Sequence, residues 1–185
     1  MSLIDYYAPR FQFRETHKIH IFAPEAKIMN AILTHEATHD PLIQKMLSLR
    51  ALPDRLWQKM GFQPNDEPPF GMDTFTVLGQ DHHKELALGL IGKFWRPDFG
   101  LIRPGSAAAF HAFDKKGVAK LVMNYRLEPI NPMKQEIRLT TETRIYCPDF
   151  ASYLLCGGYW LLIRIGSGFI RRRILNNIKR QVEAV

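Results

Sequence analysis

The chain of 185 residues is poor in cysteine: Cys147 and Cys156 are its only two. A chain of this size needs no disulfide to support its core, so we expect a reducing, cytoplasmic setting. Its 12 glycines and 12 prolines are too few for a collagen-like or low-complexity chain. Hydrophobic residues make up 46% of the chain, which argues against general disorder. We therefore expect one domain over residues 1–185.

Several functional motifs are absent. The opening residues show no basic segment followed by an apolar run, so they do not form a secretory signal. No P-loop, dinucleotide fingerprint or nucleophile elbow occurs, and no familiar nucleic-acid motif is found. The net charge of +7 permits anionic partners without identifying one. We expect no cofactor and no nucleic-acid partner.

Residues 151–170 form the one long apolar stretch, and its length would suit a membrane span. Arg164 lies well inside it, and four glycines lower its helix propensity. We interpret it as part of a C-terminal helix over residues 148–183, largely buried in the domain and not integral to a membrane.

The first half of the chain predicts one strand followed by helices. After a loose segment over residues 1–10, residues 11–23 alternate apolar and polar side chains, as a half-buried strand does. Pro24 suits a first helical turn, and Asp40 suits the cap of a second helix. A further short helix is expected from Pro53.

Five strand-like runs follow, at residues 73–78, 85–94, 106–113, 117–127 and 135–146. The connections between them are short, which favours antiparallel pairing. The sequence therefore predicts an α+β fold with helices on one face of an antiparallel sheet. Such a sheet curls, and a helix laid across its hollow leaves a cavity suited to apolar small molecules.

Short segments at residues 89–95, 117–120, 141–144, 159–160 and 167–171 occur in a distinctive order: GLIGKFW, GVAK, TETR, YW and SGFIR. On these segments the chain resembles a bacterial branch of the START-like, or SRPBCC, superfamily. The resemblance implies a helix-grip fold, in which a curved antiparallel sheet wraps around a long C-terminal helix, with two short helices after the first strand. It also implies a hydrophobic pocket between sheet and helix. The superfamily includes both carriers and enzymes, so no reaction follows from it.

Strand alternation and the expected helix position indicate which side chains line this pocket. They are Ile19, Ile21, Leu121, Met123, Tyr125, Leu139, Thr141, Thr143, Tyr153 and Trp160. We expect them to bind or carry a lipid-like or polycyclic molecule, in a protein that is a monomer or homodimer.

His17, His111 and Tyr125 are the candidates for acid–base chemistry if the protein is instead a cyclase or hydrolase on the same scaffold. Each histidine has an ordinary alternative, as a hydrogen-bonded residue of the core or of the outer sheet face. We expect a binding protein rather than an enzyme.

Residues 35–39 read His-Glu-Ala-Thr-His, a pattern that can bind zinc on a helix through His35 and His39. Asp40-Pro41 ends that helix at once, so we expect a polar helix end and no metal. His82 and His83 are expected at a solvated hairpin tip.

The Glu142–Arg144 pair and the basic helix after Arg164 are both expected at the protein surface. Glu142 and Arg144 alternate onto the outer face of their strand, where we expect an exposed ion pair of little energetic weight. The helix after Arg164 is basic and amphipathic, which leaves open attachment to an anionic membrane surface as a further alternative.

Overall fold

The computed structural model describes residues 1–34, 74–96 and 98–184. The helices and strands, in chain order, are α1 (Leu3–Tyr7), β1 (Phe13–Phe22), α2 (Glu25–Thr34), β2 (Thr76–Asp81), β3 (Glu85–Gly92), α5 (Ala107–Ala112), β4 (Ala119–Asn131), the 3-10 turn η3 (Pro132–Lys134), β5 (Glu136–Tyr146) and α6 (Phe150–Glu183).

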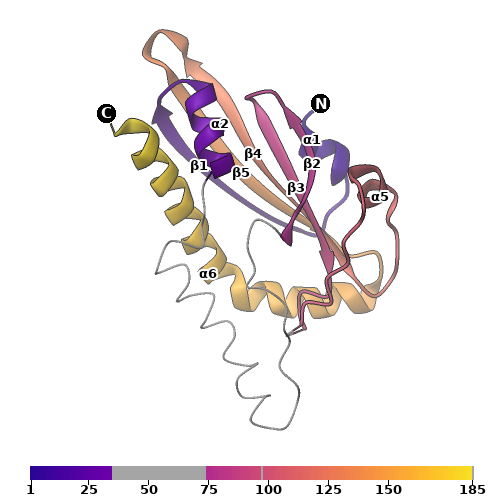
Figure 1. The fold of residues 1–185 in the computed structure, drawn as a ribbon. Helices are drawn as coiled ribbons and strands as arrows, with labels where there is room; N and C mark the ends of the chain where they lie inside the picture. The colour runs from indigo at the N-terminus through magenta and orange to yellow at the C-terminus, as the bar shows by residue number, and fades with distance from the viewer. Residues whose placement is uncertain (35–73, 97, 185) are drawn as a thin grey trace.

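The described strands form one antiparallel sheet of five strands in the order β1-β5-β4-β3-β2 (Figure 1). Strands β2 to β5 pair in chain order. Strand β1 does not pair with β2; it forms the opposite edge of the sheet, next to β5. The predicted α+β class, antiparallel sheet and C-terminal helix are confirmed, and the arrangement is compatible with a helix-grip fold. The described sheet has one strand fewer than predicted, because residues 106–113 are not a strand.

Residues 107–112 form the short helix α5 instead. Three consecutive alanines favour a helix, and the Ser106 hydroxyl caps it by accepting a hydrogen bond from the Ala109 amide at 3.1 Å. The pattern of small side chains in this segment is equally compatible with a strand, and the cap decides between them. His111 therefore lies on a helix, not on the inside of a sheet.

Helix α6 lies across the inner face of the sheet, which we define as the face turned toward α2 and α6 (Figure 1). Its two halves, Phe150–Arg164 and Gly166–Glu183, meet at an angle of 55°. Gly166, Ser167 and Gly168 follow the bend directly, and such residues are common at helix kinks. Because of the bend, the first half of α6 runs past one end of the sheet and the second half runs alongside β1.

The outer face of the sheet is covered by α1 and α5. The first ten residues, expected to be loose, include α1, and the backbone amides of Leu3 and Ile4 donate hydrogen bonds to the buried Glu85 carboxylate. This corrects the prediction. The N-terminal segment is held by a carboxylate on β3, a partner 81 or 82 residues away in the chain.

The Glu142–Arg144 pair lies on the outer face, as predicted, but it is not exposed. The two side chains are only 10% and 11% exposed and approach to 2.7 Å. Arg144 also pairs with Asp5 of α1 and donates to the Ala8 carbonyl oxygen. The expectation of a solvated pair is wrong because α1 covers this part of the sheet.

The apolar side chains of the described residues pack in three clusters. The largest lies between the inner face, α2 and the second half of α6; another lies between the sheet and the first half of α6; the third lies under α1 and α5. Among the described residues, no helix taken singly has the length and apolar character to cross a membrane. The two halves of α6 taken together meet that test, by length and composition only.

Candidate functional site

A band of polar side chains crosses the inner face of the sheet. It consists of Glu15 and His17 on β1, Thr141 and Thr143 on β5, and Tyr125 on β4, and we call it the polar band. His17 is paired in register with Thr141, which is paired with Tyr125; Glu15 is paired with Thr143 in the next inward row. Strand alternation turns all five side chains toward α6.

Apolar rows flank the polar band on both sides. Ile19 pairs with Leu139 on one side and packs in the cluster under α2 and the second half of α6. Phe13 pairs with Ile145 on the other side and packs in the cluster under the first half of α6. The polar band is thus a polar interruption in an otherwise apolar interface between sheet and helix.

Glu15 and His17 form a close pair inside this interface. His17 Nε2 lies 2.7 Å from Glu15 Oε1, and the two side chains are 12% and 9% exposed. Ser167 on α6 lies 3.4 Å from the other carboxylate oxygen. A Cβ atom at Gly168 would lie 2.9 Å from Glu15 Oε1, so a glycine at this position lets the helix approach the pair closely.

Arg171 brings a positive charge from α6 into the polar band. Its Nη1 donates a hydrogen bond to Thr141 Oγ1 at 3.1 Å and contacts the Met123 sulfur. Burial lowers the pKa of Arg171, and the nearby Tyr125 and Glu15 act in the opposite direction. Arg171 is partly buried, Thr141 Oγ1 is the one oxygen among the described residues that accepts from its guanidinium, and no described carboxylate forms a direct ion pair with it.

One hydroxyl group of the polar band, that of Thr143, is buried and left without a hydrogen-bond partner in the part of the chain that the structure describes. Burial raises the pKa of Tyr125, so its phenol stays protonated at neutral pH and remains a donor. Buried polar groups are nearly always hydrogen-bonded in native proteins, so the unpartnered Thr143 hydroxyl, one row from Tyr125 and Thr141, suggests a missing hydrogen-bond partner at this place.

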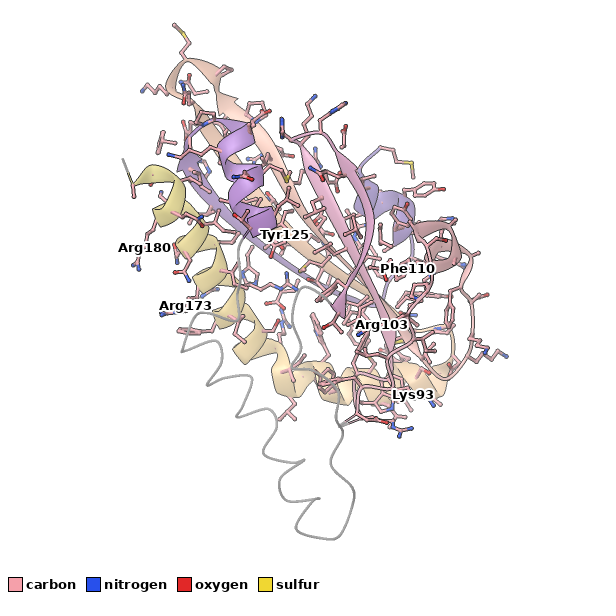
Figure 2. The ribbon with its side chains drawn as sticks, in the orientation of Figure 1. Lys93, Arg103, Phe110, Tyr125, Arg173 and Arg180 are labelled. Atoms are coloured by element: carbon pink, nitrogen blue, oxygen red, sulfur yellow. The ribbon has the colours of Figure 1, made fainter. Side chains whose placement is uncertain are left out.

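The structure brings most of the predicted lining residues together. Ile19, Ile21, Leu121, Met123, Tyr125, Leu139, Thr141 and Thr143 all lie on the inner face, and Trp160 packs in the cluster under the first half of α6. Tyr153 is at the edge of this region: it is 39% exposed and stacks on Phe13 at 5.5 Å between ring centroids. In Figure 2, Tyr125 lies on the α6 side of the sheet and Phe110 on the α5 side.

The three acid–base candidates do not converge. His17 and Tyr125 share the polar band, whereas His111 is exposed on α5 and stacks on Tyr6 at 4.7 Å. His111 therefore lies on the opposite side of the sheet from the other two, because its segment is a helix packed on the outer face.

The remaining candidate sites lie elsewhere. His82 and His83 are exposed in the turn between β2 and β3, as expected of a solvated tip. His35 and His39 lie outside the described residues. Within the described ranges, no three His, Cys, Asp or Glu side chains gather as a metal site.

Sequence reasoning missed Glu15 and Arg171. Glu15 falls between Phe13 and His17 in the strand alternation, so period-two reading places it inward despite its charge. Arg171 precedes Leu175, Ile178 and Val182 at helical spacing, and those three residues are buried. The spacing therefore puts Arg171 on the buried face of α6, although a run of three arginines looks solvated.

Comparisons of the chain with protein-family models, with curated proteins and with solved structures find no match. What the fold and the site define is an α+β protein with a buried polar band between its sheet and its C-terminal helix.

Proposed function

We propose that the protein binds an apolar small molecule with a hydrogen-bond-accepting group, held between the sheet and α6 in a helix-grip fold. The acceptor contacts Arg171, Thr143 and Tyr125, and the apolar body packs against the rows on either side of the polar band. A lipid-like or polycyclic molecule with one carboxylate or carbonyl has this distribution of polarity.

The observation that carries the proposal is the state of Arg171. Removing a guanidinium from water is costly, and the cost is offset only when its donors are satisfied. Here Thr141 is its one oxygen acceptor among the described residues. An acceptor supplied by a ligand would satisfy the remaining donors, and it would also reach the buried Thr143 hydroxyl in the neighbouring row.

Binding of oleate and of oleyl alcohol, followed by native mass spectrometry and by displacement of anilinonaphthalene sulfonate, tests the proposal. The two probes share an apolar chain and differ in the charge of the head group. Arg171→Met should weaken oleate binding by about tenfold to 100-fold, the range for a lost charge-assisted hydrogen bond, and oleyl alcohol binding much less. Arg172→Met, at the exposed neighbouring position, is the matched control and should change neither affinity.

Two results would overturn the proposal. One is that the freshly purified protein carries no small molecule and binds neither probe. The other is that Arg171→Met and Arg172→Met bind oleate equally well.

The Glu15–His17 pair favours a second candidate function, acid–base catalysis on the bound molecule. A carboxylate 2.7 Å from an imidazole nitrogen fixes the orientation of the ring, as in a positioned acid–base pair. Glu15→Gln and His17→Ala separate the candidates: a catalyst loses turnover with oleate retention unchanged, whereas a carrier shows no turnover before or after either change.

A further inference from the structure

The first half of α6 presents an apolar stripe away from the sheet. Its exposed members are Phe150, Leu154, Leu155, Leu161 and Leu162, which we call the leucine stripe. Phe150, Leu161 and Leu162 are 73%, 74% and 81% exposed. The buried residues Ser152, Cys156 and Trp160 occupy the opposite side of the same helical turns, so the stripe is the outer side of a helix whose inner side is already packed.

Helical spacing makes the stripe continuous. Residues 154, 158, 161 and 162 follow at intervals of four, three and one, which place them on one side of a helix. Gly158 lies on the same side between Leu154 and Leu161, and nothing lies within 4 Å of the position that a Cβ atom would take there. Large, contiguous exposed apolar surface of this kind marks an interaction site more often than isolated exposed residues do.

After the cap residue Asp149, the charges along the helix that carries the stripe are positive as far as Val182. From Phe150 to Val182 the helix contains arginine and lysine but no aspartate or glutamate. Arg164 and Arg172 are exposed beyond the end of the stripe. Lys93 belongs to the loop whose Phe94 and Leu101 pack in the same cluster as Trp160, so a further cation lies near this half of the helix (Figure 2).

We propose that the leucine stripe docks the protein on an anionic lipid surface, with the first half of α6 lying in the interface and the arginines contacting lipid head groups. An apolar helix side bordered by cations is the usual pattern of a helix that binds at a membrane interface. A second copy of the chain is the alternative occupant of the stripe, and the measurement of oligomeric state below distinguishes it from a lipid surface.

Co-sedimentation of the full chain with vesicles tests this inference. The probes are vesicles of phosphatidylcholine alone and of phosphatidylcholine with phosphatidylserine. The wild-type protein should sediment with the anionic vesicles and be released as salt is raised. Leu161→Gln with Leu162→Gln should reduce partitioning on the order of 100-fold, about tenfold for each leucine withdrawn from the lipid.

The controls separate the stripe from general hydrophobicity and from charge. Val77→Gln alters an apolar side chain that is 60% exposed on β2, away from α6, and should leave partitioning unchanged. Arg164→Gln should weaken binding at low salt more than at high salt. Circular dichroism of each variant verifies that the fold is retained, as expected for exposed positions.

Three outcomes overturn the inference. The wild-type protein remains in the supernatant with both kinds of vesicle; or the double leucine variant partitions as well as the wild type; or sedimentation equilibrium shows a wild-type dimer that the double variant converts to monomer, which would assign the stripe to a second copy. None of these outcomes depends on ligand binding at the polar band, so the two proposals fail or stand separately.

Discussion

Replacing Arg171 with methionine should leave the protein more stable, not less. Methionine matches the length of the arginine stem and removes the guanidinium from a partly buried position. In most proteins, loss of a buried hydrogen-bonded charge is strongly destabilising because its partner charge is left alone. Here no carboxylate pairs directly with Arg171, and Glu15 keeps its contact with His17 at 2.7 Å.

The magnitude follows from three contributions. The variant loses the hydrogen bond to Thr141, with a net value of about 1 kcal/mol, and a diffuse attraction to Glu15. The variant no longer has to remove a guanidinium from water, a cost of several kcal/mol in the wild type. The same desolvation lowers the pKa of Arg171. We expect the free energy of unfolding to rise by about 1–2 kcal/mol, within the range found when buried ionic groups are replaced by apolar ones.

Urea unfolding followed by tryptophan fluorescence measures this difference, and Arg172→Met supplies the control. The exposed control position should change the free energy of unfolding by less than about 0.5 kcal/mol. A loss of about 3 kcal/mol or more in Arg171→Met would refute the reasoning, because it would mean that the arginine is a structural residue whose donors are already satisfied. A gain in stability together with weaker oleate binding would instead mark Arg171 as a residue kept for function at a cost in stability.

Three further predictions concern the scaffold. Gly89→Ala places a Cβ atom 2.6 Å from the Phe110 ring and should cost about 1–3 kcal/mol in urea unfolding, whereas Gly158→Ala, on open helix surface, should gain about 0.5–1 kcal/mol. Asn124→Ala removes the amide that joins the Glu85 carboxylate to the Glu142 backbone and should cost about 2–4 kcal/mol; an unchanged urea midpoint would contradict the network. Asp149 caps α6, and hydrogen bonds from the Gly117 amide and from Ser152 lower its pKa to about 2. Because the folded pKa is depressed, its contribution is complete above the ordinary value of 3.8 and is lost as pH falls through about 2, so the difference in thermal midpoint between wild type and Asp149→Ala should disappear in that window.

The sequence was informative wherever one local period determined the structure. Residues 13–22 alternate along one strand, and the β3 run is apolar on both faces because helices cover both sides of it. Alternation also placed Tyr125, Thr141 and Thr143 inward without knowledge of their neighbours. These predictions depend only on backbone geometry, which the order of side chains along the chain reveals.

The sequence was misleading where a segment had two compatible local structures. Residues 106–113 contain small and aromatic side chains that fit a strand or a short helix, and the Ser106 cap decided for the helix. Glu142 and Arg144 were correctly assigned to the outer face, but their exposure depends on α1, a segment more than 130 residues earlier in the chain. No local pattern records which distant segment will cover a surface.

The sequence by itself determined the α+β class, the antiparallel pairing and the inward side of each strand, because these follow from periodicity and from short connections. Only the tertiary structure decided that Glu15, His17 and Arg171 lie in one region, since the sheet pairs β1 with β5 and α6 packs alongside β1. It also decided which side of the first half of α6 is exposed in the part of the chain that the structure describes, because Ser152, Cys156 and Trp160 pack inward and leave the leucine stripe on the outer side.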